Sequence, residues 1–175
     1  MSNNSLVLDY KKLLKETKNL NKLSVTLKKS EQKGVGLYAT KTIKKGDVIA
    51  YYKVKIFKNK GYISPTDFVY SIEIYRKNGD AYKTLIGDID KDSFPAPLDN
   101  IPFWAPFANE PSKNERINSE IDVDLRNNYK DKTFSNEGES AVYKLVATKM
   151  IRPDEEVLWY YGDIYDRKYN VGKSN

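Results

Sequence analysis

Five of the seven prolines in this chain fall between Asp92 and Pro111, near the middle of the sequence. Proline has a fixed φ angle and no amide hydrogen, so it interrupts helices and is excluded from central strands. A chain with this distribution cannot place a long helix or a central strand at its midpoint. We therefore predict a structured loop region over residues 92–111, with room for one helical turn.

Short strands are predicted on both sides of this loop. Segments that are rich in Val, Ile and Tyr, or that alternate apolar with polar residues, are typical of strands, and they occur at residues 23–27, 47–56, 68–75, 81–89, 121–125, 141–147 and 155–160. Asn78-Gly79, between two of these segments, is a strong signal for a β-hairpin. Residues 28–34 are rich in turn-forming residues. The chain is therefore predicted to be mainly β.

Residues 5–23 follow a different pattern. Leu6, Leu13 and Leu20 recur at heptad intervals, while neighbouring lysines supply a polar face. This pattern predicts a short amphipathic helix. The heptads are too few to distinguish a dimer contact from a cover for the domain, so the oligomeric state stays open.

The composition restricts the chemistry. The 175 residues suffice for one domain with its own core, and they include neither cysteine nor histidine. Without cysteine there are no disulfides, thiolate zinc sites or cysteine nucleophiles, and without histidine the usual metal ligand and neutral-pH base are missing. We predict no metal site. Chemistry that needs only a Tyr hydroxyl, backbone carbonyls and a bound cofactor remains open, and methyl transfer is such a reaction.

The net charge is +6 and comes mainly from dispersed lysines. A basic chain can bind nucleic acid, but lysines scattered among Glu and Asp are typical of a solvated surface. We therefore expect contact with nucleic acid only through a chromatin substrate. No apolar run approaches the roughly 20 residues that span a bilayer, and the polar start of the chain does not have the pattern of a signal peptide. The sequence predicts an intracellular protein without a membrane segment.

Three motifs carry the functional argument: Gly34-Val35-Gly36-Leu37, Phe107-Ala108-Asn109-Glu110 and Glu155-Glu-Val-Leu-Trp-Tyr-Tyr-Gly162. Ala-Thr-Lys segments stand beside the first and the third motif, at residues 39–41 and 147–149. Glycine allows a ligand to approach the backbone closely. Each motif alone also has a plainer explanation: a glycine turn, an Asx-type turn at Asn109, and a buried aromatic strand end.

In order and spacing, the three motifs resemble those of the SET-domain family of protein lysine methyltransferases. The resemblance covers residues 25–165 and implies a mainly β, β-clip-like SET-domain fold of several small sheets, with few short helices and a C-terminal pseudoknot. It divides the chain into an N-terminal amphipathic helix or extension (1–22), a SET domain (23–165) and a C-terminal tail (166–175). Because the chain has no cysteine, it resembles a compact member without cysteine-rich pre-SET or post-SET zinc modules.

The resemblance implies S-adenosylmethionine as the cofactor. The residues expected to bind it are Gly34, Val35, Gly36, Leu37, Phe107, Asn109, Glu110 and Tyr161. Asn109 is expected to contact the amino-acid end of the cofactor, and the backbone of Glu110 is expected to hold the adenine. Asn118 takes the place of a second Asn of the family. Glu110 departs from the family pattern, which has His there.

The resemblance also implies a catalytic residue and a substrate channel. Tyr161 is expected to be catalytic, with its hydroxyl orienting the methyl group and the incoming amine. Trp159 and Tyr165 are expected to line the channel. Because Phe or Tyr is usual at the position of Trp159, the larger indole predicts a bias toward low methylation states. Tyr165 or Tyr169 could form an aromatic lid, with a frayed polar tail as the alternative.

The implied substrate is a lysine side chain of a protein or peptide, with a histone tail as the common substrate of the family. A narrow aromatic channel would disfavour the ammonium form of that lysine, whose ordinary pKa is about 10.4. A chain of charge +6 does not attract a basic peptide over long range, so a non-histone substrate stays open. Two other functions also stay open: a non-catalytic SET-like protein-interaction module and a basic nucleic-acid-binding protein.

Overall fold

The computed structural model describes residues 10–30, 32–58, 72–74, 85–88, 94–122, 140–162, 167 and 169–172. Seven strands lie within these residues: β1 (Val25–Ser30), β2 (Gly34–Ala39), β3 (Val48–Lys58), β4 (Ile72–Ile74), β5 (Leu85–Asp88), β6 (Ser119–Asp122) and β7 (Ser140–Ala147). In the same part of the chain one α-helix, α1 (Tyr10–Glu16), accompanies two 3-10 turns, η1 (Leu20–Lys22) and η3 (Ala105–Phe107). The mainly β prediction is confirmed.

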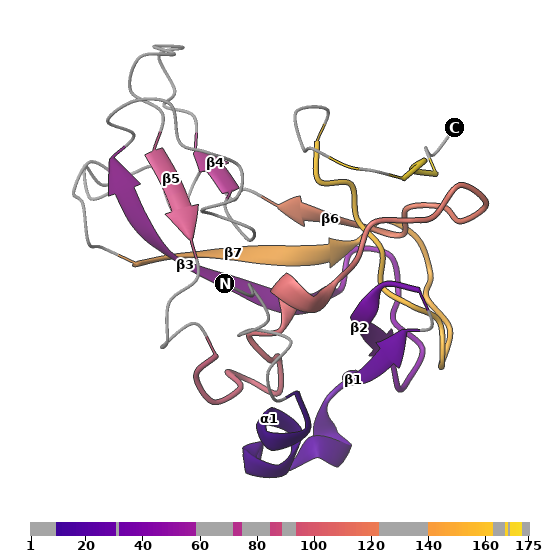
Figure 1. The fold of residues 1–175 in the computed structure, drawn as a ribbon. Coiled ribbons are helices and arrows are strands. Elements are labelled where there is room, and N and C mark those ends of the chain that lie inside the picture. The colour runs from indigo at the N-terminus through magenta and orange to yellow at the C-terminus, as the bar shows by residue number, and fades with distance from the viewer. Residues whose placement is uncertain are drawn as a thin grey trace.

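The strands form two antiparallel sheets (Figure 1). β1 and β2 form a two-stranded sheet, and the other five strands form a sheet of order β4-β5-β3-β7-β6. Figure 1 shows α1 below β1, on the opposite side of the molecule from β4 and β5. Several small sheets with few short helices are the arrangement that the resemblance implied.

The long pair β3 and β7 forms the centre of the larger sheet. The register places Tyr52 opposite Tyr143 and Ala50 opposite Leu145, and all four side chains are buried. Lysines 53 and 55 alternate with the buried residues and are partly exposed, because successive side chains of a strand point to opposite faces. One face of β3 and β7 therefore packs into the hydrophobic core, together with Trp104.

The proline-rich loop is confirmed, and it is more deeply buried than a typical surface connection. η3 is its one described helical turn, and Pro106 lies within the first residues of that turn. Trp104 is 1% exposed, and the Tyr51 amide donates to the Pro102 carbonyl at 2.8 Å. The loop thus supplies a wall of the core that regular structure does not provide.

The N-terminal prediction is wrong in length. The helix predicted for residues 5–23 is described from Tyr10 onward and ends at Glu16, and Asn19 adopts a left-handed conformation (φ 56°) before η1. Asparagine tolerates this conformation better than most residues, and it stops the helix. Leu13 and Leu14 still pack against the core from one side of α1.

Two strand predictions are shifted along the chain. The strand predicted for residues 23–27 begins at Val25 and continues to Ser30, because pairing with β2 extends it through residues expected to form a turn. The strand predicted for residues 121–125 is described as β6, Ser119–Asp122, and its last residues lie outside the described part of the chain. β4 and β5 pair antiparallel, as in the predicted hairpin, whose Asn78-Gly79 turn lies outside the described residues.

The strand predicted for residues 155–160 is wrong. This segment makes isolated bridges with two different neighbours: Glu156 with Tyr38 of β2, and Leu158 with Asn109. The Val157 amide donates to Leu37 on one side, and the Leu158 carbonyl accepts from Asn118 and Ser119 on the other. The C-terminal segment therefore passes between β2 and residues 109–119, in agreement with the predicted pseudoknot.

In the described part of the chain, none of the helices has the length and apolar character needed to cross a membrane.

Candidate active site

Asn109 lies where the first and third motifs meet. Its side-chain Nδ2 donates to the Val35 carbonyl at 3.2 Å and to Glu156 Oε1 at 2.8 Å. These partners are 74 and 47 residues away along the chain, so the Asx-type turn considered from sequence does not describe this residue. Both partners are acceptors, which fixes the orientation of the amide and leaves Oδ1 as the atom that can accept from a ligand.

Gly36 lies directly against this junction. A Cβ atom at residue 36 would lie 2.6 Å from Glu156 Oε1, 2.9 Å from a ring carbon of Tyr38 and 3.1 Å from Asn109 Nδ2. Ordinary contacts of a Cβ are longer than this. Packing of the chain's own side chains therefore favours glycine here, because a larger residue would displace Glu156 or Tyr38, in addition to any approach by a ligand.

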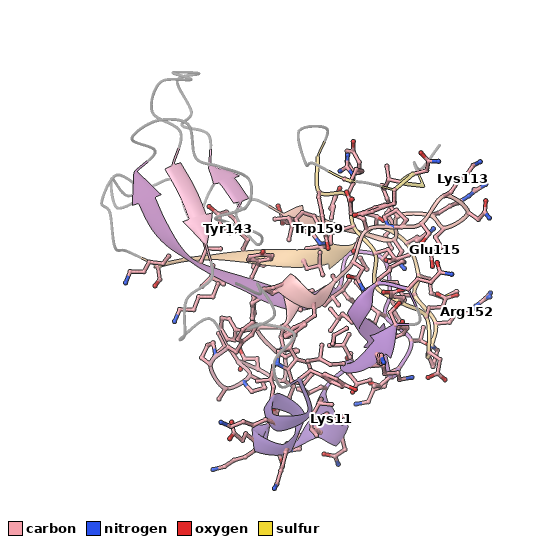
Figure 2. The ribbon with its side chains drawn as sticks, viewed as in Figure 1. Lys11, Lys113, Glu115, Tyr143, Arg152 and Trp159 are labelled. Atoms are coloured by element: carbon pink, nitrogen blue, oxygen red, sulfur yellow. The ribbon has the colours of Figure 1, made fainter. Side chains whose placement is uncertain are left out.

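Glu156 and Lys33 extend the network from Asn109. Lys33 Nζ lies 3.2 Å from Glu156 Oε2 and 2.5 Å from Glu115 Oε2, and only 16% of the Lys33 side chain is exposed. Burial alone would raise the pKa of Glu115, but hydrogen bonds from Lys33 and from the Ser112 amide outweigh it, and the pKa is lowered. Burial also raises the pKa of Tyr38, despite a hydrogen bond with Ser30. Figure 2 shows Glu115 on the side of the molecule away from β4 and β5.

Tyr161 and Trp159 converge on one backbone carbonyl. The Tyr161 hydroxyl donates to the Ala108 carbonyl at 2.8 Å, and the Trp159 indole Nε1 donates to the same oxygen at 3.1 Å. Their ring centroids are 5.0 Å apart. The Trp159 amide also donates to the Asn109 carbonyl at 3.0 Å, so this aromatic pair adjoins the Asn109 junction.

Tyr52 of β3 completes the aromatic surface. Its ring meets Trp159 edge to face at a centroid distance of 6.4 Å, and the residue is 3% exposed. Trp159, labelled in Figure 2, is thereby held by a hydrogen bond and by contacts with two aromatic rings. Edge-to-face and offset packing of this kind is favourable and fixes ring orientation. The three side chains form an apolar wall of defined geometry beside Asn109.

Other residues predicted to bind the cofactor take varied places. Gly34 begins β2 with a φ of +81°, a conformation that favours glycine, and the Val35 carbonyl accepts from Asn109. Leu37 is 0% exposed and its carbonyl accepts from Val157, so its side chain belongs to the core. Phe107 ends η3 and packs on Phe94 at a centroid distance of 5.3 Å. The structure thus brings Val35 and Asn109 into contact, and it places Leu37 and Phe107 in the supporting framework.

The second asparagine, Asn118, fastens the C-terminal segment. Its Nδ2 donates to the Glu156 carbonyl at 2.7 Å, and its Oδ1 accepts from the Leu158 amide at 2.8 Å. The residue is 6% exposed. Its side chain therefore replaces the strand pairing that residues 156–158 do not make.

Glu110, at the position where the family has His, is 3% exposed, and its carboxylate faces the C-terminal tail. It accepts from the Tyr161 amide, from the Arg167 guanidinium and from the Tyr169 hydroxyl. The hydrogen bond with Glu110 raises the pKa of Arg167, with burial opposing it. Tyr169 is half exposed, and Tyr165 lies outside the described residues.

Sequence reasoning missed four contributors: Lys33, Tyr52, Glu156 and Arg167. Each joins the site through a partner on a different element, such as Glu156 with Asn109 or Arg167 with Glu110. Glu156 lies inside the third motif, and its place as the last of three acidic residues before an apolar run was the one available signal. Tyr52 had no signal beyond its place in an alternating strand.

Comparisons with known proteins give the family and the fold. The family model described as SET domain matches residues 34–162. No match is found among curated proteins. Similar solved structures include CpSET8 from Cryptosporidium, with 18% identity and a TM-score of 0.51, covering 79% of this chain and 57% of that one.

Two further solved structures are similar at lower scores. The methyltransferase domain of human PR domain-containing protein 2 has 19% identity and a TM-score of 0.47, covering 90% of this chain and 87% of that one. A candidate histone methyltransferase of Plasmodium falciparum has 19% identity and a TM-score of 0.45, covering 82% of this chain and 96% of that one. Since the family model spans most of the sequence and includes all three motifs, the chain belongs to the SET domain family.

Proposed function

We propose that this protein is an S-adenosylmethionine-dependent methyltransferase that acts on a lysine side chain of a protein or peptide. Membership of the SET domain family supports methyl transfer. The observation that carries the proposal is the convergence of the Tyr161 hydroxyl and the Trp159 indole on the Ala108 carbonyl, next to Asn109. This arrangement places a phenol, an aromatic wall and a fixed amide in one site.

The donor set at Asn109 fits the amino-acid end of the cofactor. Val35 and Glu156 use Nδ2, so Asn109 offers Oδ1, an acceptor suited to an α-ammonium group. Val35 lies alongside through its backbone carbonyl, and Gly36 lies alongside without a side chain. When bound, S-adenosylmethionine supplies a methyl group on a positively charged sulfur. The task left to the protein is to align that group with an amine.

The aromatic residues prepare the amine. The Tyr161 hydroxyl donates its hydrogen to the Ala108 carbonyl, and a phenol oxygen can also accept a hydrogen bond, which suits it to orient a lysine nitrogen. Trp159 and Tyr52 supply an apolar wall that excludes water. Such surroundings lower the pKa of a lysine and favour the neutral, nucleophilic form. Ring faces also tolerate the methylated cation that forms. The chain thus performs the reaction by placement and desolvation, without a histidine base.

The substrate class remains protein or peptide lysine, from a histone tail or another protein. Membership of the SET domain family supports a protein substrate. The net charge of +6 works against long-range attraction of a basic tail. A peptide screen should therefore include neutral and acidic sequences around lysine as well as histone tails.

Cofactor binding by calorimetry is the first test. Wild type should bind S-adenosylmethionine, and Asn109→Ala should weaken binding by about 10- to 100-fold, as expected for loss of a hydrogen bond to a charged group. Asn21→Ala is the matched control, because it removes an exposed amide from η1. Folded wild-type protein that does not bind the cofactor would contradict the proposal and favour a non-catalytic interaction module.

Tyr161→Phe tests the chemistry. With a peptide that wild type methylates, the variant should lose activity on the order of 10²-fold, a loss typical for a group that acts in the transition state. Cofactor affinity should stay within a few fold. Tyr10→Phe, on α1, is the control. Unchanged turnover in Tyr161→Phe would remove this residue from the catalytic role.

A further inference from the structure

The buried carboxylate of Glu110 connects three parts of the chain. Oε1 accepts from the Tyr161 amide at 2.8 Å and from Arg167 at 2.7 Å, while Oε2 accepts from Arg167 Nε at 3.0 Å and from the Tyr169 hydroxyl at 2.8 Å. A carboxylate has about four acceptor sites, and these bonds use both oxygens. The Arg167 pairing is two-pronged, the geometry that gives a guanidinium its strongest bonds to a carboxylate.

The tail that Arg167 begins is docked along residues 110–115. Arg167 also donates to the Gly162 carbonyl at 2.6 Å, and its guanidinium lies 5.2 Å from the Tyr160 ring centroid. Farther on, Val171 forms a bridge with Ser112, and the Gly172 amide donates to Pro111 at 3.1 Å. A Cβ on Gly172 would lie 2.1 Å from the Glu115 carbonyl oxygen, so only glycine fits there. The tail follows this loop closely.

Glu110 also belongs to the short segment that holds the predicted catalytic tyrosine. The Tyr161 hydroxyl donates to the Ala108 carbonyl, and the Tyr161 backbone amide donates to the Glu110 carboxylate. Residues 108–110 therefore hold Tyr161 at both ends. Movement of the Glu110 carboxylate would release the backbone of Tyr161 and the tail together.

We propose that Glu110 is a positioning residue that couples docking of the C-terminal tail to the placement of the Tyr161 hydroxyl. In this arrangement a buried ion pair fastens the tail beside the site. Coupling of the tail to Tyr161 is independent of the reaction, whereas its effect on methyl transfer rests on the proposed function.

Amide hydrogen exchange in the full chain tests the coupling without an activity assay. In Glu110→Gln, the replacement turns one acceptor into a donor that faces Arg167, so the pairing is lost. We expect the amides of Tyr161 and Gly172 to exchange at least about tenfold faster, and the Leu145 amide of β7 to be unchanged. Glu120→Gln, an exposed carboxylate in β6, is the matched control. Unchanged exchange at Gly172 would show that the tail docks without Glu110 and would overturn the proposal.

Turnover separates positioning from support of the fold. At a temperature well below unfolding, Glu110→Gln should lower kcat at least tenfold, with a change in cofactor Kd below about threefold. Tyr169→Phe removes one hydroxyl from a half-exposed ring, so it leaves the fold intact and should lower kcat by about two- to fivefold. If Glu110→Gln does not fold, this variant carries the test through the same readouts.

The outcomes distinguish the two proposals. An active wild type whose kcat is unchanged in both variants overturns the coupling to Tyr161. A wild type without activity on any peptide contradicts the proposed function, and the exchange of Tyr161 and Gly172 still decides whether Glu110 couples them. Arg167→Ala should be less stable than Arg167→Ala combined with Glu110→Gln, because the single variant leaves a buried charge unpaired. The opposite order would refute the ion pair as the fastening element.

Discussion

Substitution of Gly36 by alanine tests whether the glycine motif serves the packing of the protein itself. The added Cβ would lie 2.6 Å from Glu156 Oε1 and 2.9 Å from the Tyr38 ring. The Glu156 carboxylate could swing away, but it would then lose its 2.8 Å bond from Asn109 and its ion pair with Lys33. The substitution therefore either leaves a steric clash with Glu156 or breaks the interactions of Glu156 with Asn109 and Lys33.

The expected cost follows from these contacts. Overpacking of a well-filled site costs about 1–3 kcal/mol. Alanine also lowers the entropy of the unfolded chain, which restores about 0.4–1 kcal/mol. We expect a net loss in the free energy of unfolding on the order of 1–2 kcal/mol, or about 2–8 °C in Tm for a protein of this size. This loss should appear in protein without cofactor.

Thermal unfolding of four proteins measures the effect: wild type, Gly36→Ala, Glu156→Ala and the double variant. The alanine at residue 36 should cost less once Glu156 is truncated, by roughly 1 kcal/mol, because contacting residues are not additive. Gly34→Ala is the control. Its φ of +81° strains any side chain, but nothing lies within 4 Å of its Cβ, so truncation of Glu156 should not relieve its cost.

Two results would refute this reasoning. If Gly36→Ala is as stable as wild type without cofactor, then the contacts with Glu156 and Tyr38 relax freely. If the two substitutions are additive, Glu156 is not the obstructing group. The first result would leave ligand approach as the reason for the glycine, and the second would make Tyr38 or Asn109 the obstructing group.

Two other predictions concern the product and the dependence on pH. Trp159→Phe should shift the product toward higher methylation states, because the phenyl ring is smaller than the indole and does not donate to the Ala108 carbonyl. Mass spectrometry of a methylated peptide measures the product distribution. Trimethyl product that is already dominant in wild type would contradict the argument that Trp159 crowds the channel. For Glu115, a folded-state pKa below its ordinary 4.5 means that its contribution to stability is present above that pH and is lost as the pH falls through the folded pKa. The Tm difference between wild type and Glu115→Gln should therefore be largest near neutral pH and vanish in acid, and a difference that grows in acid would refute the sign.

Local sequence determined much of the fold. The prolines between residues 92 and 111 enforced a loop with a single 3-10 turn, and alternation in residues 48–55 produced a strand with one buried face. Both effects arise from short-range physics, the fixed φ of proline and the two-residue period of a strand. Motif order also indicated the family, which the match to residues 34–162 shows.

Tertiary structure decided the elements whose partners are far away along the chain. Residues 155–160 have the composition of a strand, but they lie between β2 and the loop near Asn118 and pair with both in alternation. The predicted N-terminal helix stops at Glu16, because Asn19 adopts a left-handed turn that a heptad pattern does not reveal. In each case the deciding interaction is a long-range contact or a backbone angle, which composition does not encode.

The same distinction between local sequence and tertiary structure applies to the candidate active site. The sequence alone determined which residue types are present: Tyr161 and Trp159 in an aromatic run, Asn109 between two prolines, and no histidine or cysteine. Only the tertiary structure decided which of these residues interact. Tyr161 and Trp159 both donate to the Ala108 carbonyl, Asn109 donates to Glu156, and Glu110 accepts from Arg167. Hydrogen bonds depend on distance and direction between groups that the chain brings together from remote positions. A sequence can therefore name the chemistry of this site, whereas the fold sets its geometry.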